Sequence, residues 1–494
     1  MCSPSAFECT LCESLNFSLA GSPLNTRSSI SNRRWRKFAG LLSALVLANA
    51  GSGCSEPERS QPNVLLITVD TLRADRLGVY GFNLETSPAI DRLAARGVVF
   101  ERAIAGASFT SGSHASIMTS RYTREHTIGY MNGGTRLEGI TTVAEIFNRE
   151  GYRTAAFVGN IMLNRSIGLD RGFEVYDDEL PHAELNRGFA FERIAEQTTE
   201  SALLWLKSSD HRPFFLWVHY QDPHGPYTPP PEFRGRFRPE FKPDEKPLPI
   251  LDTVTGLNGI PSYQELDGIR RPSVYETRYA EEIAYADHWI GKLISQVDAN
   301  PSDSGTIVVF TADHGESLGE ENLYFSHGST TTPDQAHVPL ILRAPGLPEG
   351  RRMETVHHVD VMPTLLDLVG FEVPADTSGI ALGPIIRGDS PLPDRLVYCD
   401  EGFDLSAYGP GGFVRVGNIL AAWNSGETNR LPMMAPRWAA YRWAPGEDWR
   451  AVDEIDASSK TAIRSYFRQA IPMVEAEKPS HLRIERLRAL GYAE

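Results

Sequence analysis

The chain has 494 residues, of which 41% are apolar, so it can form a large core and predicts one big domain with a smaller one. Its formal net charge is −15, and the first 53 residues carry an excess of positive charge, so the remainder is more acidic still. Such a body offers no cationic surface to nucleic acid and repels an anionic membrane, so we expect no nucleic-acid partner. The chain has five cysteines, three of them in its first twelve residues, which excludes a disulfide framework.

The N-terminal segment has the pattern of an export signal. Basic residues at positions 33–37 precede an apolar stretch that is too short to span a bilayer comfortably. The next four residues, Gly51 to Cys54, resemble a bacterial lipobox, although Gly51 stands where Leu is usual. We predict an export signal over residues 1–53, a possible lipid anchor at Cys54 and a linker over residues 54–61. The protein would then be exported, either periplasmic or anchored as an outer-membrane lipoprotein; a simple cleaved signal or an uncleaved anchor are the alternatives.

Strand-like and helix-like segments then alternate along the chain. Strands are expected at residues 63–70, 154–158, 214–219, 306–311 and 338–343, and helices at 87–97, 113–118, 141–150, 191–206, 275–297 and 362–368. This alternation predicts an α/β fold with a mostly parallel sheet and helices on both faces, over residues 62–390. Residues 225–273 are rich in proline and charge without clear periodicity, which indicates a long surface excursion, such as a lid.

The pattern changes beyond residue 390. Short strand-like pieces occur at residues 397–399, 413–416, 419–423 and 439–443, followed by a helical segment at 458–469. We therefore predict a small α+β domain over residues 391–494.

Potential metal ligands follow three of the predicted strands. Asp70 ends the first strand, His219 ends a later one, and Asp313 with His314 follows another. A single Asp after a strand is usually a helix cap or a turn residue. Ligands of open α/β sheets, however, bind beyond the carboxyl ends of the strands, so three such residues at one edge favour a functional site.

Six segments together resemble the sulfatase family of the alkaline phosphatase superfamily. They are Val64 to Gly81, Phe109 to Tyr122, Phe214 to Tyr227, Thr311 to Glu316, Ser326 to Arg343 and Leu487 to Tyr492. The resemblance implies an alkaline-phosphatase-like fold and a metal-dependent hydrolase that cleaves a small anionic ester, sulfated or phosphorylated. By position in the motifs it implies Thr110 as a metal-bound nucleophile and Asp70, Thr110, Asp313 and His314 as metal ligands.

The chain departs from the family pattern at several of these positions. Sulfatases carry a Cys or Ser that is oxidised to formylglycine, and Thr110 cannot be converted to that aldehyde. His114 replaces the usual Arg, Thr71 the usual second Asp, and His314 the usual Asn. The family's Gly-Lys-x-His segment becomes Gly159 to Met162, and His327 falls where Lys is frequent.

These departures leave several roles and activities open. We expect His224 and His327 to act on the oxyanion or as the general acid, and His114, Asn160 and His219 to bind substrate. One alternative is a phosphodiesterase or phosphomonoesterase with a phosphothreonine intermediate, in which His224, His327 and either Asp222 or His219 help to hold a second metal. Another is a catalytically inactive exported binding protein. The divalent metal would be calcium, magnesium or manganese, with zinc possible.

Overall fold

The computed structural model describes residues 61–400 apart from 130–135, 209, 254, 300–303 and 394, and, beyond residue 400, mainly the backbone of four strands. The predictions for residues 1–60, including the anchor at Cys54, and for the segments 458–469 and 487–492 lie essentially outside the described residues. Within the described part, no helix combines the length and the apolar character needed to cross a membrane.

An eight-stranded sheet forms the centre of the described residues, in the order β14-β2-β13-β10-β1-β7-β3-β4. Its strands are β1 (Asn63–Val69), β2 (Val98–Ile104), β3 (Arg153–Val158), β4 (Val175–Asp177), β7 (Phe214–Tyr220), β10 (Thr306–Ala312), β13 (His337–Arg343) and β14 (Gly350–His357). Only β13 runs against the others, which confirms the predicted mostly parallel sheet. The central strands β1, β7 and β10 are buried along their whole length, as their continuous apolar runs require.

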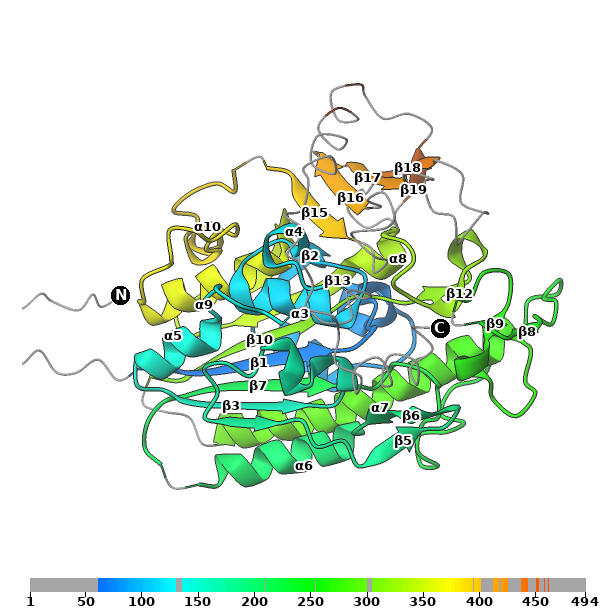
Figure 1. The fold of residues 1–494 in the computed structure, drawn as a ribbon, viewed down its shortest axis with the longest axis horizontal. Helices are drawn as coiled ribbons and strands as arrows, with labels where there is room; N and C mark the ends of the chain where they lie inside the picture. Colours follow the sequence, from blue (N-terminus) through cyan, green and yellow to red (C-terminus); the bar gives the residue numbers. More distant parts are fainter. Residues whose placement is uncertain are drawn as a thin grey trace, which may run out of the picture. The chain divides into compact units, whose positions relative to one another are not determined.

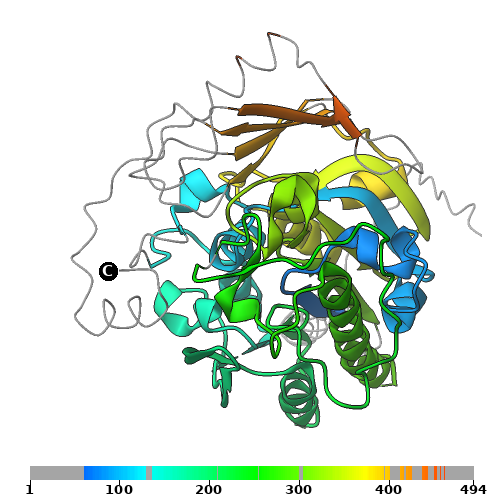
Figure 2. The same ribbon diagram turned by 90° about the vertical axis from the view of Figure 1, so that its right-hand side faces the viewer.

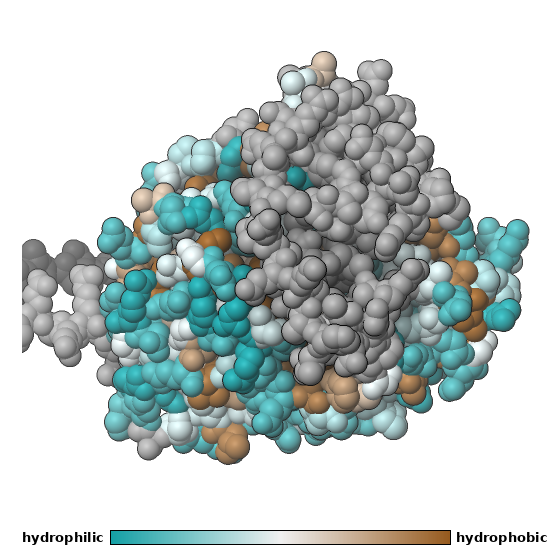
Figure 3. Space-filling model, in the orientation of Figure 1, coloured by the Kyte–Doolittle hydropathy of each residue, from teal (hydrophilic) through white to brown (hydrophobic). Residues whose placement is uncertain are grey.

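Helices pack on both faces of this sheet (Figure 1). They are α2 (Pro88–Ala94), α3 (Thr110–Thr119), α4 (Thr123–His126), α5 (Val143–Arg149), α6 (Ala195–Leu206), α7 (Pro272–Ala299), α8 (Pro333–Ala336), α9 (Val361–Val369) and α10 (Gly383–Arg387). The helices α6 and α7 lie together on one face, and α3, α5 and α9 lie on the other. The described part of the face seen in Figure 3 is largely hydrophilic, with apolar side chains in small groups.

Several elements differ from the sequence expectations. The helix expected from residue 191 begins only at Ala195, because the preceding residues form a hairpin of β5 (His182–Glu184) and β6 (Arg187–Glu192). Strand β14 was not predicted because its first half is charged and exposed at the edge of the sheet. The excursion 225–273 contains two short strands, β8 (Ile250–Leu251) and β9 (Ile260–Pro261), and a 3₁₀ turn, η5 (Ser262–Gln264).

A second sheet follows residue 396 and is antiparallel (Figure 2, orange and brown strands). Its strands in order are β15 (Val397–Asp400), β16 (Gly412–Val416), β17 (Ile419–Asn424), β18 (Arg437–Arg442) and β19 (Arg450–Val452). The first four agree with the strand-like pieces expected from the sequence, whereas β19 was not expected.

The sheet order brings three predicted strand ends to one edge. Strands β10, β1 and β7 are parallel neighbours, with Val69 level with Ala312 on one side and with Tyr220 on the other. Asp70 donates its backbone N–H to the carbonyl of Tyr220 at 2.9 Å, and Asp313 donates to Val69 at 3.2 Å. The residues that follow these strands are therefore fixed beside one another.

Candidate active site

Two buried carboxylates lie at the carboxyl edge of the sheet. Asp70 follows β1 and Asp313 follows β10, and neither is accessible to solvent. Asp70 Oδ1 and Asp313 Oδ2 have no hydrogen-bond partner in the protein. Burial, together with the nearby charge of Asp313, raises the pKa of Asp70 well above its usual range. Burial raises the pKa of Asp313 to about 8. Two such groups stay ionised at neutral pH only if a cation compensates their charge.

His314 presents one ring nitrogen to both carboxylates. Its Nδ1 lies 2.9 Å from the carbonyl of Gly315, which fixes the ring, and its Nε2 lies 3.9 Å from Asp70 Oδ1 and 3.6 Å from Asp313 Oδ2 without a hydrogen bond. Burial and the neighbouring His327 lower the pKa of His314 to about 4. The imidazole is therefore neutral near pH 7, the form that binds a metal.

The turn after β1 is built around Asp313. Thr71 has a φ of 53°, a conformation that is rare for a β-branched residue. In this conformation its backbone N–H reaches Asp313 Oδ1 at 3.1 Å, and the N–H of His314 reaches the same oxygen at 2.7 Å. One carboxylate oxygen is thus held by the backbone, while Oδ2 remains available to a ligand.

These residues fit a divalent metal. The candidate ligand atoms of Asp70, Asp313 and His314 all lie within 4.8 Å of one another. Each residue also has one buried polar atom without a protein partner, which a cation would satisfy. Two carboxylate oxygens and one imidazole nitrogen suit manganese, zinc, magnesium or calcium.

The first turn of α3 is tied to this cluster. Thr110 is the first residue of α3 and is buried. One turn along, Ser113 donates its hydroxyl to the carbonyl of Asp313 at 2.6 Å. His114 Nδ1 lies 2.8 Å from the carbonyl of Thr110 and 3.7 Å from Asp313 Oδ2. The N-terminal turn that carries the expected nucleophile therefore lies beside the carboxylates.

His114 is held by a chain of hydrogen bonds from the sheet. Trp217 donates its Nε1–H to Thr68 Oγ1 at 2.9 Å, and Thr68 Oγ1 lies 3.0 Å from His114 Nε2. With its proton on Nδ1, a neutral His114 satisfies Thr68 on one side and the Thr110 carbonyl on the other. Burial lowers the pKa of His114 to about 3, in agreement with the neutral form. Both ring nitrogens of His114 therefore have protein partners, and neither is free to contact a substrate. The substrate contact expected for His114 stays a prediction.

The other two residues expected to bind substrate lie around Asp70. Asn160 donates from Nδ2 to Asp70 Oδ2 at 2.6 Å and accepts the N–H of Met162 at 2.7 Å, so its amide orients the carboxylate. His219 is fully buried in β7, and its Nε2 lies 3.7 Å from Asp70 Oδ2. Neither ring nitrogen of His219 has a hydrogen-bond partner. The structure brings both residues to the cluster, while their contact with substrate stays a prediction.

The two histidines expected in catalysis lie side by side next to His314. The ring centroid of His327 is 4.6 Å from that of His314 and 5.2 Å from that of His224. His224 is fixed through Nδ1, 2.7 Å from the carbonyl of Gly225. Burial lowers the pKa of His327 to about 3 and that of His224 well below its usual range. The predicted catalytic histidines therefore form one wall of the same site.

Sequence reasoning missed two ionisable groups beside these histidines. Glu316 is fully buried, its Oε1 lies 3.3 Å from His327 Nδ1, and burial raises its pKa to about 8. It lies in a recognised motif, three residues after Asp313, but no role had been assigned to it. Arg187, on the β5–β6 hairpin, lies over the ring of Tyr263 at 4.3 Å, and its charge helps to lower the pKa of His224 and His327. No sequence signal marks Arg187, because the hairpin itself was not predicted.

The excursion 225–273 supports the strand that leads to His327. Phe325 has a φ of 54° and is fully buried, an unusual conformation for a bulky residue. Its carbonyl accepts the hydroxyl of Tyr263 at 3.0 Å and Nε2 of Gln264 at 3.1 Å. Both donors are buried, so this part of the excursion is packed against the site.

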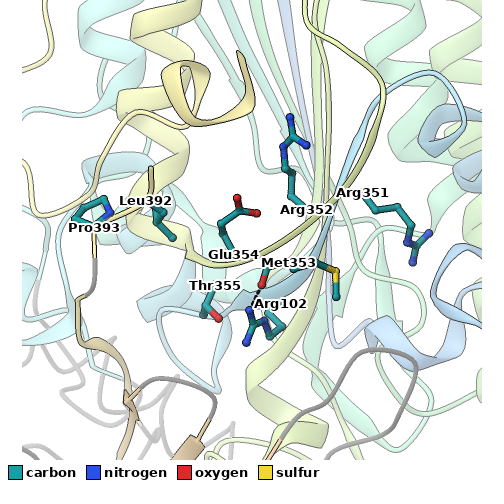
Figure 4. A pocket seen from close by; sticks show the side chains of 8 residues that line it. All are labelled: Arg102, Arg351, Arg352, Met353, Glu354, Thr355, Leu392 and Pro393. Carbon is teal, nitrogen blue, oxygen red and sulfur yellow. Dashed lines mark hydrogen bonds between the residues drawn. The ribbon is translucent and has the colours of Figure 1, made fainter. Parts of the chain in front are cut away.

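An arginine-lined hollow of about 470 Å³ at the β14 edge is a different feature (Figure 4). The guanidinium groups of Arg102, Arg351 and Arg352 point in different directions. They donate to the backbone carbonyls of Met353, Val79 and Ile386, respectively. The hollow therefore does not converge on an anion.

The chain is similar to known sulfatases. The sulfatase family model matches residues 62–371. A Delta 4,5-hexuronate-2-O-sulfatase of Bacteroides thetaiotaomicron is 27% identical over 369 residues, which cover 68% of this chain and 74% of the relative. The multifunctional alkaline phosphatase superfamily protein PehA of Trinickia caryophylli is 25% identical over 413 residues, covering 67% and 78%.

The solved structures share the fold. The phosphonate monoester hydrolase of Silicibacter pomeroyi superposes with a TM-score of 0.62 at 22% identity, covering 83% of this chain and 96% of that one. This likeness confirms the alkaline-phosphatase-like α/β fold. Because the family model spans more than half of the chain, the protein belongs to the sulfatase family of hydrolases, which act on ester bonds.

Proposed function

We propose that this sulfatase-family hydrolase cleaves a sulfate or phosphate ester with Thr110 as the nucleophile. Asp70, Asp313 and His314 hold the divalent metal, and Thr110 is its further ligand. The observation that carries the proposal is the attachment of the first turn of α3 to Asp313 through Ser113 and His114. This attachment supports a role for the hydroxyl of Thr110, the first residue of the helix, at the carboxylate cluster.

The chain's own residues supply most of the reaction. A bound metal neutralises the anionic ester and acidifies a nearby hydroxyl. Thr110 Oγ1 loses its proton to solvent water and bonds to the phosphorus or sulfur atom, while the bond to the leaving alcohol oxygen breaks. Protonated Glu316 donates to Nδ1 of His327, so the neutral ring carries its own proton on Nε2. That Nε2 proton passes to the leaving oxygen, and Nδ1 takes the proton of Glu316 in its place. His224 beside His327 is positioned to contact the other ester oxygens.

The identity of the nucleophile favours phosphate esters as the first reaction to test. A secondary alcohol such as Thr110 cannot be oxidised to an aldehyde, so no geminal diol is available to expel a bound sulfate. The covalent ester on Thr110 must instead be hydrolysed by water, which restores the hydroxyl and releases the phosphoryl or sulfuryl product. A phosphothreonine ester, formed from a phosphodiester or a phosphomonoester, is suited to this second step. One relative, PehA, is itself described as multifunctional.

A panel of chromogenic substrates tests the proposal. The purified protein, loaded in turn with Mn²⁺, Zn²⁺, Mg²⁺ and Ca²⁺, is assayed with an aryl sulfate, an aryl phosphate and an aryl phosphodiester. We expect metal-dependent turnover that Thr110→Ala lowers at least about 10³-fold, whereas Thr110→Ser, which keeps a hydroxyl, retains more activity. Acid quenching should trap a phosphorylated or sulfated peptide that contains Thr110.

Two outcomes would overturn it. Parental activity in Thr110→Ala would exclude this residue as the nucleophile. No turnover of any ester by the metal-loaded protein would favour the inactive binding protein, an alternative that draws no support from relatives named as enzymes.

We also propose that the protein is exported, with residues 1–53 as the signal and Cys54 as the lipid anchor. The basic stretch, the short apolar stretch and the small residues before Cys54 support this. Metabolic labelling with a fatty acid and membrane fractionation test it. Label that persists in Cys54→Ala, or an unprocessed N-terminus, would overturn the anchor.

A further inference from the structure

His219 is an exception among the buried histidines of the site. It is fully buried, yet neither Nδ1 nor Nε2 has a hydrogen-bond partner in the protein. Buried imidazoles normally satisfy both nitrogens, because an unpaired polar atom retains its desolvation penalty. The two open nitrogens therefore indicate that the ring is arranged for a group that is not part of the chain.

The neighbouring His114 provides an internal comparison. The two rings are stacked, with centroids 4.7 Å apart, and both are completely buried. His114 nevertheless has a partner on each nitrogen, Thr110 on one side and Thr68 on the other. The unsatisfied state is thus particular to His219 and is not a general consequence of depth.

The open nitrogens of His219 lie close to two carboxylates of the cluster, of which Asp70 Oδ2 already accepts a hydrogen bond from Asn160. The Nε2 of His219 lies 3.7 Å from Asp70 Oδ2, and a ring nitrogen lies within 4.8 Å of an Asp313 carboxylate oxygen. Asp70 Oδ1, Asp313 Oδ2 and His314 Nε2 are also unpartnered. Neighbouring ligand atoms on one divalent ion lie about 3–4 Å apart, since each is about 2.0–2.6 Å from the ion. The separations around Asp70 fall in this range.

We propose that His219 is a further ligand of the ion held by Asp70, Asp313 and His314. This inference rests on the metal of the proposed function and adds a second imidazole to its ligands. Two imidazoles beside two carboxylates favour manganese or zinc over calcium or magnesium.

A separate second ion held by His219 is the weaker interpretation. Candidate ligand atoms of His114, His219 and Asp313 also lie within 4.8 Å of one another. Both nitrogens of His114, however, are engaged by the protein. Only His219 and Asp313 would then be open to that ion, which is too few protein ligands for a stable site.

Pulsed electron paramagnetic resonance of the Mn²⁺-loaded full chain tests the proposal without substrate. The number of directly coordinated imidazoles is counted in the parent protein and after ¹⁵N labelling of histidine. We expect two in the parent and one in His219→Asn, with a loss of Mn²⁺ affinity of about 10-fold to 100-fold by calorimetry. His114→Gln is the matched control, and it should retain two coordinated imidazoles.

The outcomes separate this inference from the proposed function. A single imidazole in the parent, or an unchanged count in His219→Asn, overturns the ligand role even if the enzyme is active. If His219→Asn does not fold, His224→Gln with His327→Gln decides the question: a count that falls below two overturns the proposal, and a count that stays at two supports it. Failure of every ester substrate with two imidazoles coordinated would instead reject the proposed function alone.

Discussion

Two buried aspartates of this protein, Asp360 and Asp313, differ in how the charge of the carboxylate is compensated. Asp360, in a 3₁₀ turn before α9, is fully buried and accepts the N–H groups of His357 at 2.9 Å and Ile380 at 3.0 Å. The Arg395 guanidinium pairs with both of its oxygens. Asp313 is equally buried, but no basic side chain neutralises it and its Oδ2 has no partner. The chain thus supplies hydrogen-bond and ion-pair partners to both oxygens of Asp360, which stabilises the fold. Asp313 keeps one oxygen that can bind a cation.

Replacing Asp313 should have the largest effect on activity. Asp313→Asn removes one anionic metal ligand, so we expect turnover to fall at least about 10³-fold and Mn²⁺ binding to weaken strongly. The metal-free variant should be at least as stable as the metal-free parent, because an amide carries no charge to desolvate. Calorimetric metal binding and thermal unfolding in chelator check both parts. A metal-free variant that is clearly destabilised would show that Asp313 is structural, like Asp360.

Removing the carboxylate behind His327 should have an intermediate effect. Glu316→Gln keeps the shape of the side chain but loses the ionisable carboxyl group that faces His327 Nδ1 at 3.3 Å. We expect kcat to fall about 10-fold to 100-fold with KM nearly unchanged, and to fall most for substrates with poor leaving groups. Glu281→Gln is a matched control, since Glu281 is a fully buried carboxylate whose ion pair is with Arg278 on α7. Equal losses in both variants would argue against an orienting role.

Asp360→Asn should separate stability from activity. It leaves the mostly buried Arg395 without its carboxylate, which costs about 3 kcal/mol of the free energy of unfolding. Turnover per folded molecule should stay within about twofold of the parent, because no metal ligand is changed. Chemical denaturation and an assay normalised to folded protein measure the two quantities. Loss of metal affinity in this variant would contradict the division between the two carboxylates.

The difference between these carboxylates also marks the limit of sequence analysis. Asp70 and Asp313 follow long apolar runs, so their place at one sheet edge could be predicted from the strands alone. The partners of each carboxylate could not be predicted. Whether the ring nitrogens of His219 have partners depends on the strand register that sets this residue beside Thr68. Arg187 belongs to a hairpin that shows no apolar periodicity in the sequence. The edge strand β14 was missed for a related reason, since its charged first half hides the strand pattern.

The smallest expected effect is a pH dependence that only the metal-free protein shows. Burial raises the pKa of Asp313 and of Glu316 to about 8, so in the folded, metal-free state both groups bind protons that the unfolded chain has already released. Stability must then fall as the pH rises towards 8.

The buried histidines act in the opposite sense only below about pH 6.5, where the unfolded chain binds protons that the fold excludes. Between pH 6.5 and 8 these carboxylates and others with a raised pKa, such as Glu192 and Asp287, all act in this direction, and the Tm in chelator should drop by a few degrees. A bound metal keeps Asp313 ionised and binds more tightly as the pH rises, so the Mn²⁺-loaded protein should show a smaller drop over the same interval. Scanning calorimetry at several pH values distinguishes the two curves, and parallel declines would mean that the ion does not contact Asp313.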